Sequence, residues 1–295
     1  MQNKMIFKRS APAKINLYLD VLGKRSNGYH DIESIMQSIS LFDELTLEIS
    51  DSSAFKIEIS CSSESIPNDK SNLVWRACIA YLNAIGKSNT SKCFKFHIEK
   101  NIPVCAGMAG GSTDCACALR LLNEAYNFAL SEDELFKIGS SLGADVGFCL
   151  TGKTAICRGV GDIITPILCP TELYLVCAID NSSVSTPEAF KMLDDKYGTN
   201  AQAYGMLKNI SDSIEKGDIR LLGSLLYNKF ESVICEKNPT IDVIKSTLLD
   251  YGALGALMSG SGPSVFGIFD NHEAQLNAYE ALKSKKIRAF LCKTA

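Results

Sequence analysis

The first part of the chain has the alternating pattern of a sheet. From Lys14 to Leu22, apolar residues occupy every second position, which is the period of a strand with one buried face. Lys14 and Asn16 therefore share the polar face of this strand. A Ser-Asn-Gly turn at 26–28 leads to further strand-like sequence up to residue 49. We expect the first part of the chain to be sheet-forming.

Two helices with clear end signals follow. Ser71 or Asn72 can cap a helix that Gly86 ends. Ser131 and Glu134 have the spacing of a capping box, which satisfies free amide groups at the start of a second helix. We expect this second helix to end at residue 143, directly before an Ala-Asp-Val sequence.

Between these helices lies a glycine-rich loop. A strand-like stretch around 94–98 runs into Pro103–Asp114, and an Ala- and Leu-rich helix is expected over Cys115–Tyr126. Glycines let a backbone approach a phosphate closely, and a helix start adds free amide groups and partial positive charge. On its own, the loop fits a phosphate site and a plain strand-to-helix turn equally well.

The second half of the chain mixes strands and helices in a different order. A strand is expected around 173–179, and Thr186-Pro187 opens a helix with proline at its first position. Further helices are expected at 218–235, at 240–251 and from Glu273, and strands at 255–258, 264–269 and 287–292. A glycine-rich turn meets proline near Thr165, where we place a domain boundary.

Residues 147–154 satisfy the phosphate-loop expression G-x-x-x-x-G-K-[ST]. A phosphate loop follows a strand and opens a helix, whereas this segment follows an expected helix and precedes an expected strand. We therefore do not assign a phosphate site to it.

Composition and charge narrow the classes of function. The chain has 295 residues, enough for about two domains. Its formal net charge of −3 leaves no excess of positive charge for a nucleic-acid backbone or an anionic membrane. A small-molecule partner is therefore expected, with no nucleic acid and no membrane.

The twelve cysteines lack the regular spacing of a disulfide framework, and no paired C-x-x-C indicates zinc. With three histidines, the chain suggests no Ser-His-Asp or metal-ligand set. No signal-peptide or membrane-spanning pattern is present, so we expect a cytoplasmic, reducing location. Taken singly, Lys14 and Asp145 are more simply interpreted as solvated surface charges.

Three separated motifs, taken together and in order, resemble one family. They are Ala-Pro-Ala-Lys-Ile-Asn-Leu at 11–17, the loop at 103–114, and Met-Ser-Gly-Ser-Gly-Pro at 258–263. In this combination the chain is similar to the GHMP kinases, which phosphorylate small molecules such as galactose, homoserine and mevalonate. Because the motifs span the chain, their combination is far more specific than any one of them.

The resemblance implies a two-domain GHMP kinase fold of the α+β class. Residues 1–165 would form the ATP-binding domain, like ribosomal protein S5 with a left-handed βαβ element. Residues 166–295 would form a ferredoxin-like domain that completes the substrate cleft. It also implies ATP and Mg²⁺ as cofactors, Asp145 as catalytic base and Lys14 as its catalytic partner, with the metal ligands unassigned. The implied ATP-binding residues are Pro103, Val104, Cys105, Ala106, Gly107, Met108, Ala109, Gly110, Gly111, Ser112 and Thr113.

Further segments at 25–31, 110–114 and 142–146 resemble one branch of the family. That branch phosphorylates the 2-hydroxyl of a cytidine-diphosphate-linked methylerythritol, in the non-mevalonate route to isoprenoid precursors. The resemblance implies that Tyr29 and His30 hold the cytosine ring and that Phe190 is a second stacking aromatic. Asn16 and Thr186 belong to the same implied substrate site.

The loop departs modestly from the family pattern. The common loop has Gly, Leu, Gly and Ser where this chain has Cys105, Met108, Ala109 and Thr113. Ala109 matters most, because a Cβ there could narrow the approach of the phosphates if the site needs a positive φ. The alternative function is a catalytically silent binding module of the same fold, against which the presence of Lys14 and Asp145 argues.

Overall fold

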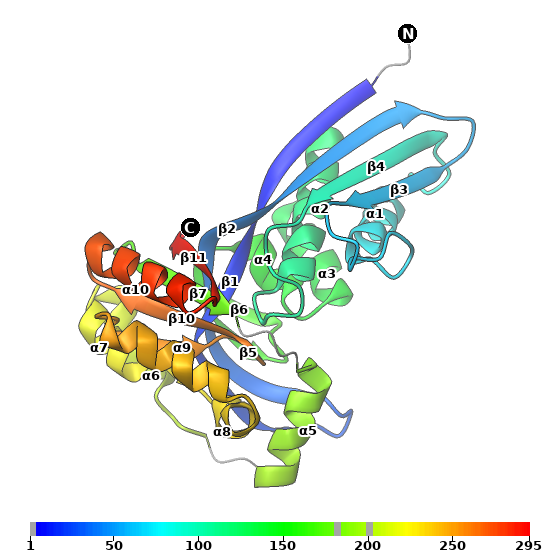
Figure 1. The fold of residues 1–295 in the computed structure, drawn as a ribbon. Helices are drawn as coiled ribbons and strands as arrows, with labels where there is room; N and C mark the ends of the chain where they lie inside the picture. The colour runs from blue at the N-terminus through cyan, green and yellow to red at the C-terminus, as the bar shows by residue number, and fades with distance from the viewer. Residues whose placement is uncertain (1–3, 180–183, 199–202) are drawn as a thin grey trace. The chain divides into compact units, whose positions relative to one another are not determined.

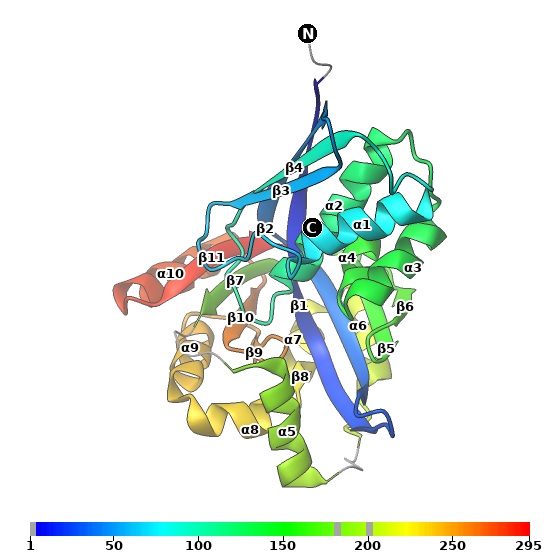
Figure 2. The same cartoon turned by 90° about the vertical axis from the view of Figure 1, so that its right-hand side faces the viewer.

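The structure is a computed structural model that describes residues 4–179, 184–198 and 203–295. Contacts divide these residues into two compact units, one formed by residues up to Ala13, 41–104 and 109–151, the other by 14–40, 105–108 and 152–295. Strands β1 (Lys4–Lys24) and β2 (His30–Asp51) pair side by side and run through both units (Figure 2). Each unit is therefore built from separate segments, whereas the sequence predicts a single boundary near Thr165.

The first unit packs four helices beside a sheet (Figure 1). Strand β4 (Lys92–Glu99) pairs antiparallel with β2 and parallel with β3 (Lys56–Cys61). The helices are α1 (Leu73–Ala84), α2 (Gly110–Ala125), α3 (Glu132–Leu142) and α4 (Val146–Thr151). Phe94, Phe96, Tyr81 and Leu119 are among the fully buried side chains of this unit's core. The connection from β3 through α1 to the parallel strand β4 is a βαβ element.

The structure confirms two of the helix starts that the sequence predicts and corrects a third. The Asn72 side chain accepts the Val74 N–H, and both halves of the Ser131–Glu134 capping box are present. The start expected at Cys115 is wrong, because α2 begins at Gly110. The Thr113 hydroxyl donates to the Pro12 carbonyl at 2.8 Å, a contact across the unit that fixes the early turn and that local propensity does not contain.

The second unit contains an antiparallel sheet in the order β11 (Arg288–Lys293), β7 (Tyr174–Ile179), β10 (Ser264–Phe269) and β9 (Gly255–Met258). Helices α9 (Pro239–Asp250) and α10 (His272–Ser284) pack against it (Figure 1). This is the strand order of the ferredoxin-like fold. The expected strands and helices between 239 and 293 are confirmed.

The second unit contains further strands and helices besides this sheet. They are β5 (Thr154–Gly159), β6 (Ile163–Pro166), β8 (Tyr227–Asn228), α5 (Thr186–Tyr197), α6 (Leu207–Glu215), α7 (Ile219–Leu225), α8 (Glu231–Ile234) and a 3-10 helix, η1 (Cys235–Lys237). The helix α6 is not among the elements that the sequence predicts. Residues 147–154 form the helix α4 and then enter β5, so the rejection of a phosphate loop is confirmed.

The single helix expected at 218–235 is wrong. The segment breaks into α7, β8 and α8 because β8 pairs with β1 and the Asn228 side chain donates to the carbonyls of Met258 and Gly260 at 2.7 and 2.8 Å. These partners are about thirty residues away in the chain. Long-range pairing therefore overrides the helical pattern.

All twelve cysteines lie within the described residues and are free thiols. Among the described residues, no helix is long and apolar enough to cross a membrane.

Candidate functional site

Lys14 and Asn16 lie together in the second unit, as the strand pattern predicts. The Lys14 ammonium donates to Asn16 Oδ1 at 2.8 Å, and Asn16 Nδ2 donates to the Ser34 hydroxyl at 2.8 Å. Both Lys14 and Asn16 are buried. Buried polar groups of this kind are costly unless they are hydrogen-bonded, so the network holds the Lys14 side chain in a defined orientation.

The second-unit part of the glycine loop is bonded to the same strand. The backbone N–H of Lys14 donates to the Met108 carbonyl at 3.2 Å. The Ser259 hydroxyl donates to the Gly107 carbonyl at 3.1 Å and accepts the Asn16 N–H at 3.3 Å. Gly107 has φ +72°, and a Cβ there would lie 2.2 Å from the Ser259 carbonyl oxygen. The first and third sequence motifs thus meet at Gly107, where only glycine fits.

The rest of the glycine loop, in the first unit, forms the start of α2. Ala109 is the N-cap residue, with φ 58°, and its side chain makes no capping hydrogen bond. The amide groups of Gly110, Gly111 and Ser112 precede the first intrahelical bond, so they can hold an anion. Cys105 also has a positive φ, of 56°. The two residues that depart from the family's glycines therefore sit where glycine is unstrained.

A buried charge cluster lies beside the start of α2 in the same unit. Lys100 Nζ is 2.8 Å from Asp114 Oδ2 and also donates to Asp43, whose other oxygen accepts two backbone N–H groups. Asp114 Oδ1 has no hydrogen-bond partner in the described structure. Burial raises the pKa of Asp114 to about 7, and the attraction of Lys100 offsets this only in part. Burial opposes the charge of Lys100, but the two carboxylates outweigh it and raise its pKa.

Asp145 lies directly before α4 in the first unit, after the end of α3. It is partly buried, and its carbonyl accepts the Cys149 N–H at 3.0 Å, the first helical bond of α4. The structure thus places Asp145 at a helix start, following the helix that the sequence predicts.

The residues expected to hold a base lie in the second unit. His30 and Phe190 are stacked, with ring centroids 4.4 Å apart and planes at 17°, and Phe230 meets Phe190 edge-on at 5.0 Å. The His30 Nε2 atom lies 2.8 Å from Asp194 Oδ1, and Lys24 donates to Asp194 Oδ2 at 2.6 Å. The resemblance implies that His30 and Phe190 belong to one base site, but it does not imply that their rings stack directly. It does not point to Asp194 or Lys24 either, because Asp194 is 164 residues from His30 in the chain.

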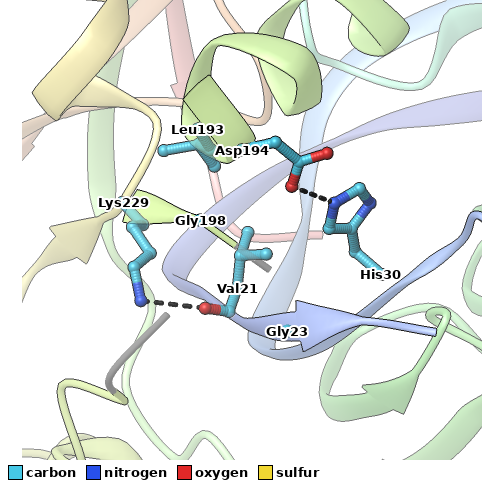
Figure 3. A pocket seen from close by; sticks show the side chains of 7 residues that line it. All are labelled: Val21, Gly23, His30, Leu193, Asp194, Gly198 and Lys229. Carbon is cyan, nitrogen blue, oxygen red and sulfur yellow. Dashed lines mark hydrogen bonds and ion pairs between the residues drawn. The ribbon is translucent and has the colours of Figure 1, made fainter. Parts of the chain in front are cut away.

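Tyr29 directly precedes His30 in the chain, and Thr186 begins the helix α5 that carries Phe190. Tyr29 is 64% exposed and follows the turn between β1 and β2, with its N–H bonded to Asn27. The Thr186 hydroxyl lies 3.1 Å from the Ser261 hydroxyl, in the third motif. A cavity of about 10 Å³, roughly the space of one water molecule, lies among His30, Asp194 and neighbouring residues (Figure 3).

Two carboxylates near this cavity are each paired with a lysine. Burial opposes the ionisation of Asp194, but hydrogen bonds from Lys24 and His30 outweigh it and lower the pKa of Asp194. Lys229, which also lines the cavity, forms a buried ion pair with Asp20 at 2.9 Å. The described residues contain no cluster of three or more acidic, histidine or cysteine side chains that could hold a metal by itself.

The chain matches two family descriptions, "GHMP kinases N terminal domain" over residues 72–153 and "GHMP kinases C terminal" over 209–288. A protein of Alkaliphilus metalliredigens named 4-diphosphocytidyl-2-C-methyl-D-erythritol kinase is 41% identical over 92% of this chain and 90% of its own length. One of the same name from Clostridium novyi is 40% identical over 96% of this chain and 98% of its own length.

Solved structures agree in fold. A crystal structure of 4-(cytidine 5'-diphospho)-2C-methyl-D-erythritol kinase has a TM-score of 0.80 and 29% identity, covering 98% of this chain and 99% of that one. The mevalonate kinase of L. major has a TM-score of 0.76 at 20% identity, covering 100% of this chain and 98% of that one. At this level of identity the likeness indicates a shared fold only. The chain belongs to the GHMP kinases, a family of small-molecule kinases, and within them to the 4-diphosphocytidyl-2-C-methyl-D-erythritol kinases.

Proposed function

We propose that the protein transfers the γ-phosphoryl group of ATP to the 2-hydroxyl of 4-diphosphocytidyl-2-C-methyl-D-erythritol, in the non-mevalonate pathway to isoprenoid precursors. The observation that carries this proposal is similarity at about 40% identity, over more than nine tenths of the chain, to proteins of that name. The stacked His30–Phe190 pair supports a site for an aromatic base.

ATP phosphates bind at the start of α2 in this proposal. The amide groups of Gly110, Gly111 and Ser112 point out of the helix end and carry its partial positive charge. Gly107, whose φ and close contact with Ser259 exclude a side chain, fixes the path of the loop before the helix. The local amide groups matter because the net charge of −3 supplies no attraction for two polyphosphorylated substrates.

Lys14 and Asp145 carry the chemistry in this proposal. Phosphoryl transfer passes through a loose transition state, so a kinase chiefly aligns the attacking hydroxyl and stabilises charge. Asp145 accepts the proton of the tertiary hydroxyl, which is a weak nucleophile with a high pKa. Lys14, held by Asn16, offsets the negative charge that develops on the transferred group.

Mg²⁺ fits this site as an ion held mainly by ATP. Mg²⁺ commonly takes one or two protein oxygens and binds phosphates with the rest of its sites, so it does not need a cluster of protein carboxylates. Ser112 and Asp145, both in the first unit, are the side chains that could hold it. When bound, the ion neutralises charge on the phosphates.

A coupled assay of ADP release tests the proposal. We expect ATP-dependent turnover with 4-diphosphocytidyl-2-C-methyl-D-erythritol and none with homoserine or mevalonate. Asp145→Asn should lower kcat by about a hundredfold or more, because general-base catalysis contributes on that scale. Turnover with homoserine or mevalonate instead would leave the family intact and overturn the substrate. A wild-type rate in Asp145→Asn would remove that residue from the chemistry.

A further inference from the structure

We infer that Ser34, on strand β2, is a positioning residue for phosphoryl transfer. Its hydroxyl sets which end of the Asn16 side-chain amide faces Lys14, and through that amide it fixes the direction of the Lys14 ammonium. The inference rests on the proposed function, because it assumes that the ammonium acts on the transferred group. All the residues that carry it lie in the second unit.

Hydrogen-bond polarity allows one direction only along this chain of groups. The Ser34 hydroxyl lies 2.6 Å from the Tyr18 carbonyl, which can only accept, so the single hydroxyl proton points there. Towards Asn16 the hydroxyl oxygen can then only accept, so the amide nitrogen must be the end that lies 2.8 Å away. The amide oxygen therefore faces the Lys14 ammonium, at 2.8 Å. An ammonium can only donate, so both ends of the chain require the same orientation of the amide.

Solvent does not reach the centre of this network. Ser34 is 0% exposed and Asn16 is 1% exposed. Without the hydroxyl, a buried amide N–H would lose its acceptor, which is unfavourable, and the amide would no longer be fixed on that side. A turned amide would present its nitrogen, a donor, to the Lys14 ammonium, which is also a donor. Ser34 therefore stabilises the arrangement in which Asn16 accepts from Lys14.

The backbone of this segment is held by other contacts. The Lys14 N–H donates to the Met108 carbonyl at 3.2 Å, and the Asn16 N–H donates to the Ser259 hydroxyl at 3.3 Å. Strand β1, which carries both residues, pairs with β2 and β8. Removal of the Ser34 hydroxyl should therefore leave the backbone in place and change the orientation of the side chains.

Orientation matters for a lysine because its ammonium sits on a flexible chain of four carbons and carries three N–H groups. Fixing one N–H on the Asn16 oxygen restricts where the other two can point. Donors that are already aimed at a developing charge need no reorganisation during the reaction. Loss of this alignment acts on the transition state, so it should lower kcat and leave KM for both substrates near the wild-type value.

A double-mutant cycle tests whether Ser34 acts through Asn16. We expect Ser34→Ala to lower kcat about tenfold, the size of one lost hydrogen bond. Ser34→Thr keeps the hydroxyl and should restore most of this loss. In an Asn16→Ala background, Ser34→Ala should lower kcat by less than about twofold, because residues of one network are not additive. A fall of about tenfold in both backgrounds would overturn the inference.

Ser38→Ala is the matched control. Ser38 lies on the same strand and is buried like Ser34, and its hydroxyl hydrogen-bonds to no residue within the described ranges. This variant also loses a buried hydroxyl and should keep the wild-type kcat, whatever its free energy of unfolding. A fall in kcat equal to that of Ser34→Ala would show that the effect does not depend on Asn16, and would overturn the inference.

Hydrogen exchange of the Asn16 side-chain amide, followed by nitrogen NMR, tests the geometry without turnover. We expect slow exchange in the wild type and exchange about tenfold faster or more in Ser34→Ala. Equal rates in the two proteins would overturn the inference. If Ser34→Ala does not fold, slow exchange in the wild type supports the inference, and exchange at the rate of a solvent-exposed amide overturns it.

These measurements separate the inference from the proposed function. Absence of turnover by the wild type with the cytidine substrate would refute the function, and the exchange rates would still decide whether Ser34 holds Asn16. Normal turnover with an unchanged kcat in folded Ser34→Ala would refute the inference and leave the function standing.

Discussion

Gly111 offers the sharpest test of the phosphate site, because a side chain can be added there without disturbing the fold. It is exposed in the first turn of α2, and a Cβ would meet only the Leu73 methyl at 3.9 Å, an ordinary contact. At Gly110, by contrast, a Cβ would lie 2.8 Å from Lys100 Nζ. Gly111→Val therefore places two methyl groups where the phosphates are expected and little else.

The expected magnitudes separate folding from binding. Valine is slightly more favourable than glycine within a helix, by a few tenths of a kcal/mol, so the free energy of unfolding should change by less than about 0.5 kcal/mol. Hydrogen bonds to charged groups contribute about 1.5–3 kcal/mol each. Displacing the phosphates from one or two amide groups should therefore weaken ATP binding by about 3 kcal/mol, or roughly a hundredfold in Kd.

Titration calorimetry with ATP, paired with urea unfolding, measures both quantities. Gly111→Ala is the graded control, and its smaller side chain should weaken ATP binding less than valine does. Affinity for the cytidine substrate should stay near the wild-type value in both variants. An unchanged Kd for ATP in a folded Gly111→Val protein would refute the placement of the phosphates at the start of α2.

Three further perturbations address other parts of the account. Phe190→Ala should raise KM for the cytidine substrate roughly 5- to 150-fold, which corresponds to about 1–3 kcal/mol of lost stacking, and should leave KM for ATP unchanged. An equal loss for both substrates would place Phe190 outside the base pocket. Ala109→Gly should stabilise the protein by up to about 1 kcal/mol in urea unfolding, because glycine relieves the positive φ of 58°, and destabilisation would contradict that strain. The raised pKa of Asp114 means that the folded protein retains a proton that the unfolded chain releases near pH 4. The stability that this bound proton contributes is therefore lost as the pH rises through about 7. Asp114→Asn stays neutral at every pH. The difference in free energy of unfolding between this variant and the wild type should therefore shift in favour of the variant from pH 5 to pH 8. A difference that does not change with pH would contradict the proton at Asp114.

Local signals in the sequence predicted much of the fold. The capping box at Ser131 and the cap at Asn72 fixed two helix starts, because their hydrogen bonds are made within three residues. The alternation after Lys14 placed its side chain with that of Asn16, since both depend only on the period of a strand. The order of elements after residue 239 followed from the same periodicities.

Features that depend on distant partners could not be predicted this way. The break at Tyr227–Asn228 arises from pairing with β1 and from carbonyls beyond residue 257. The Lys100–Asp114 pair and the Asp194 carboxylate beside His30 join segments that carry no common pattern. Ala109 illustrates a different limit, because the Cβ of an alanine disfavours the positive φ that the loop imposes on it.

The central claim is that the transferred phosphate reaches the 2-hydroxyl of the cytidine-diphosphate-linked methylerythritol. Phosphorus NMR of a reaction with ATP, Mg²⁺ and this substrate tests it directly. We expect a new phosphate monoester signal coupled to the erythritol carbon skeleton, formed in step with ADP, while the diphosphate bridge to cytidine stays intact. Release of ADP without a monoester, or a monoester on another hydroxyl, would contradict the account.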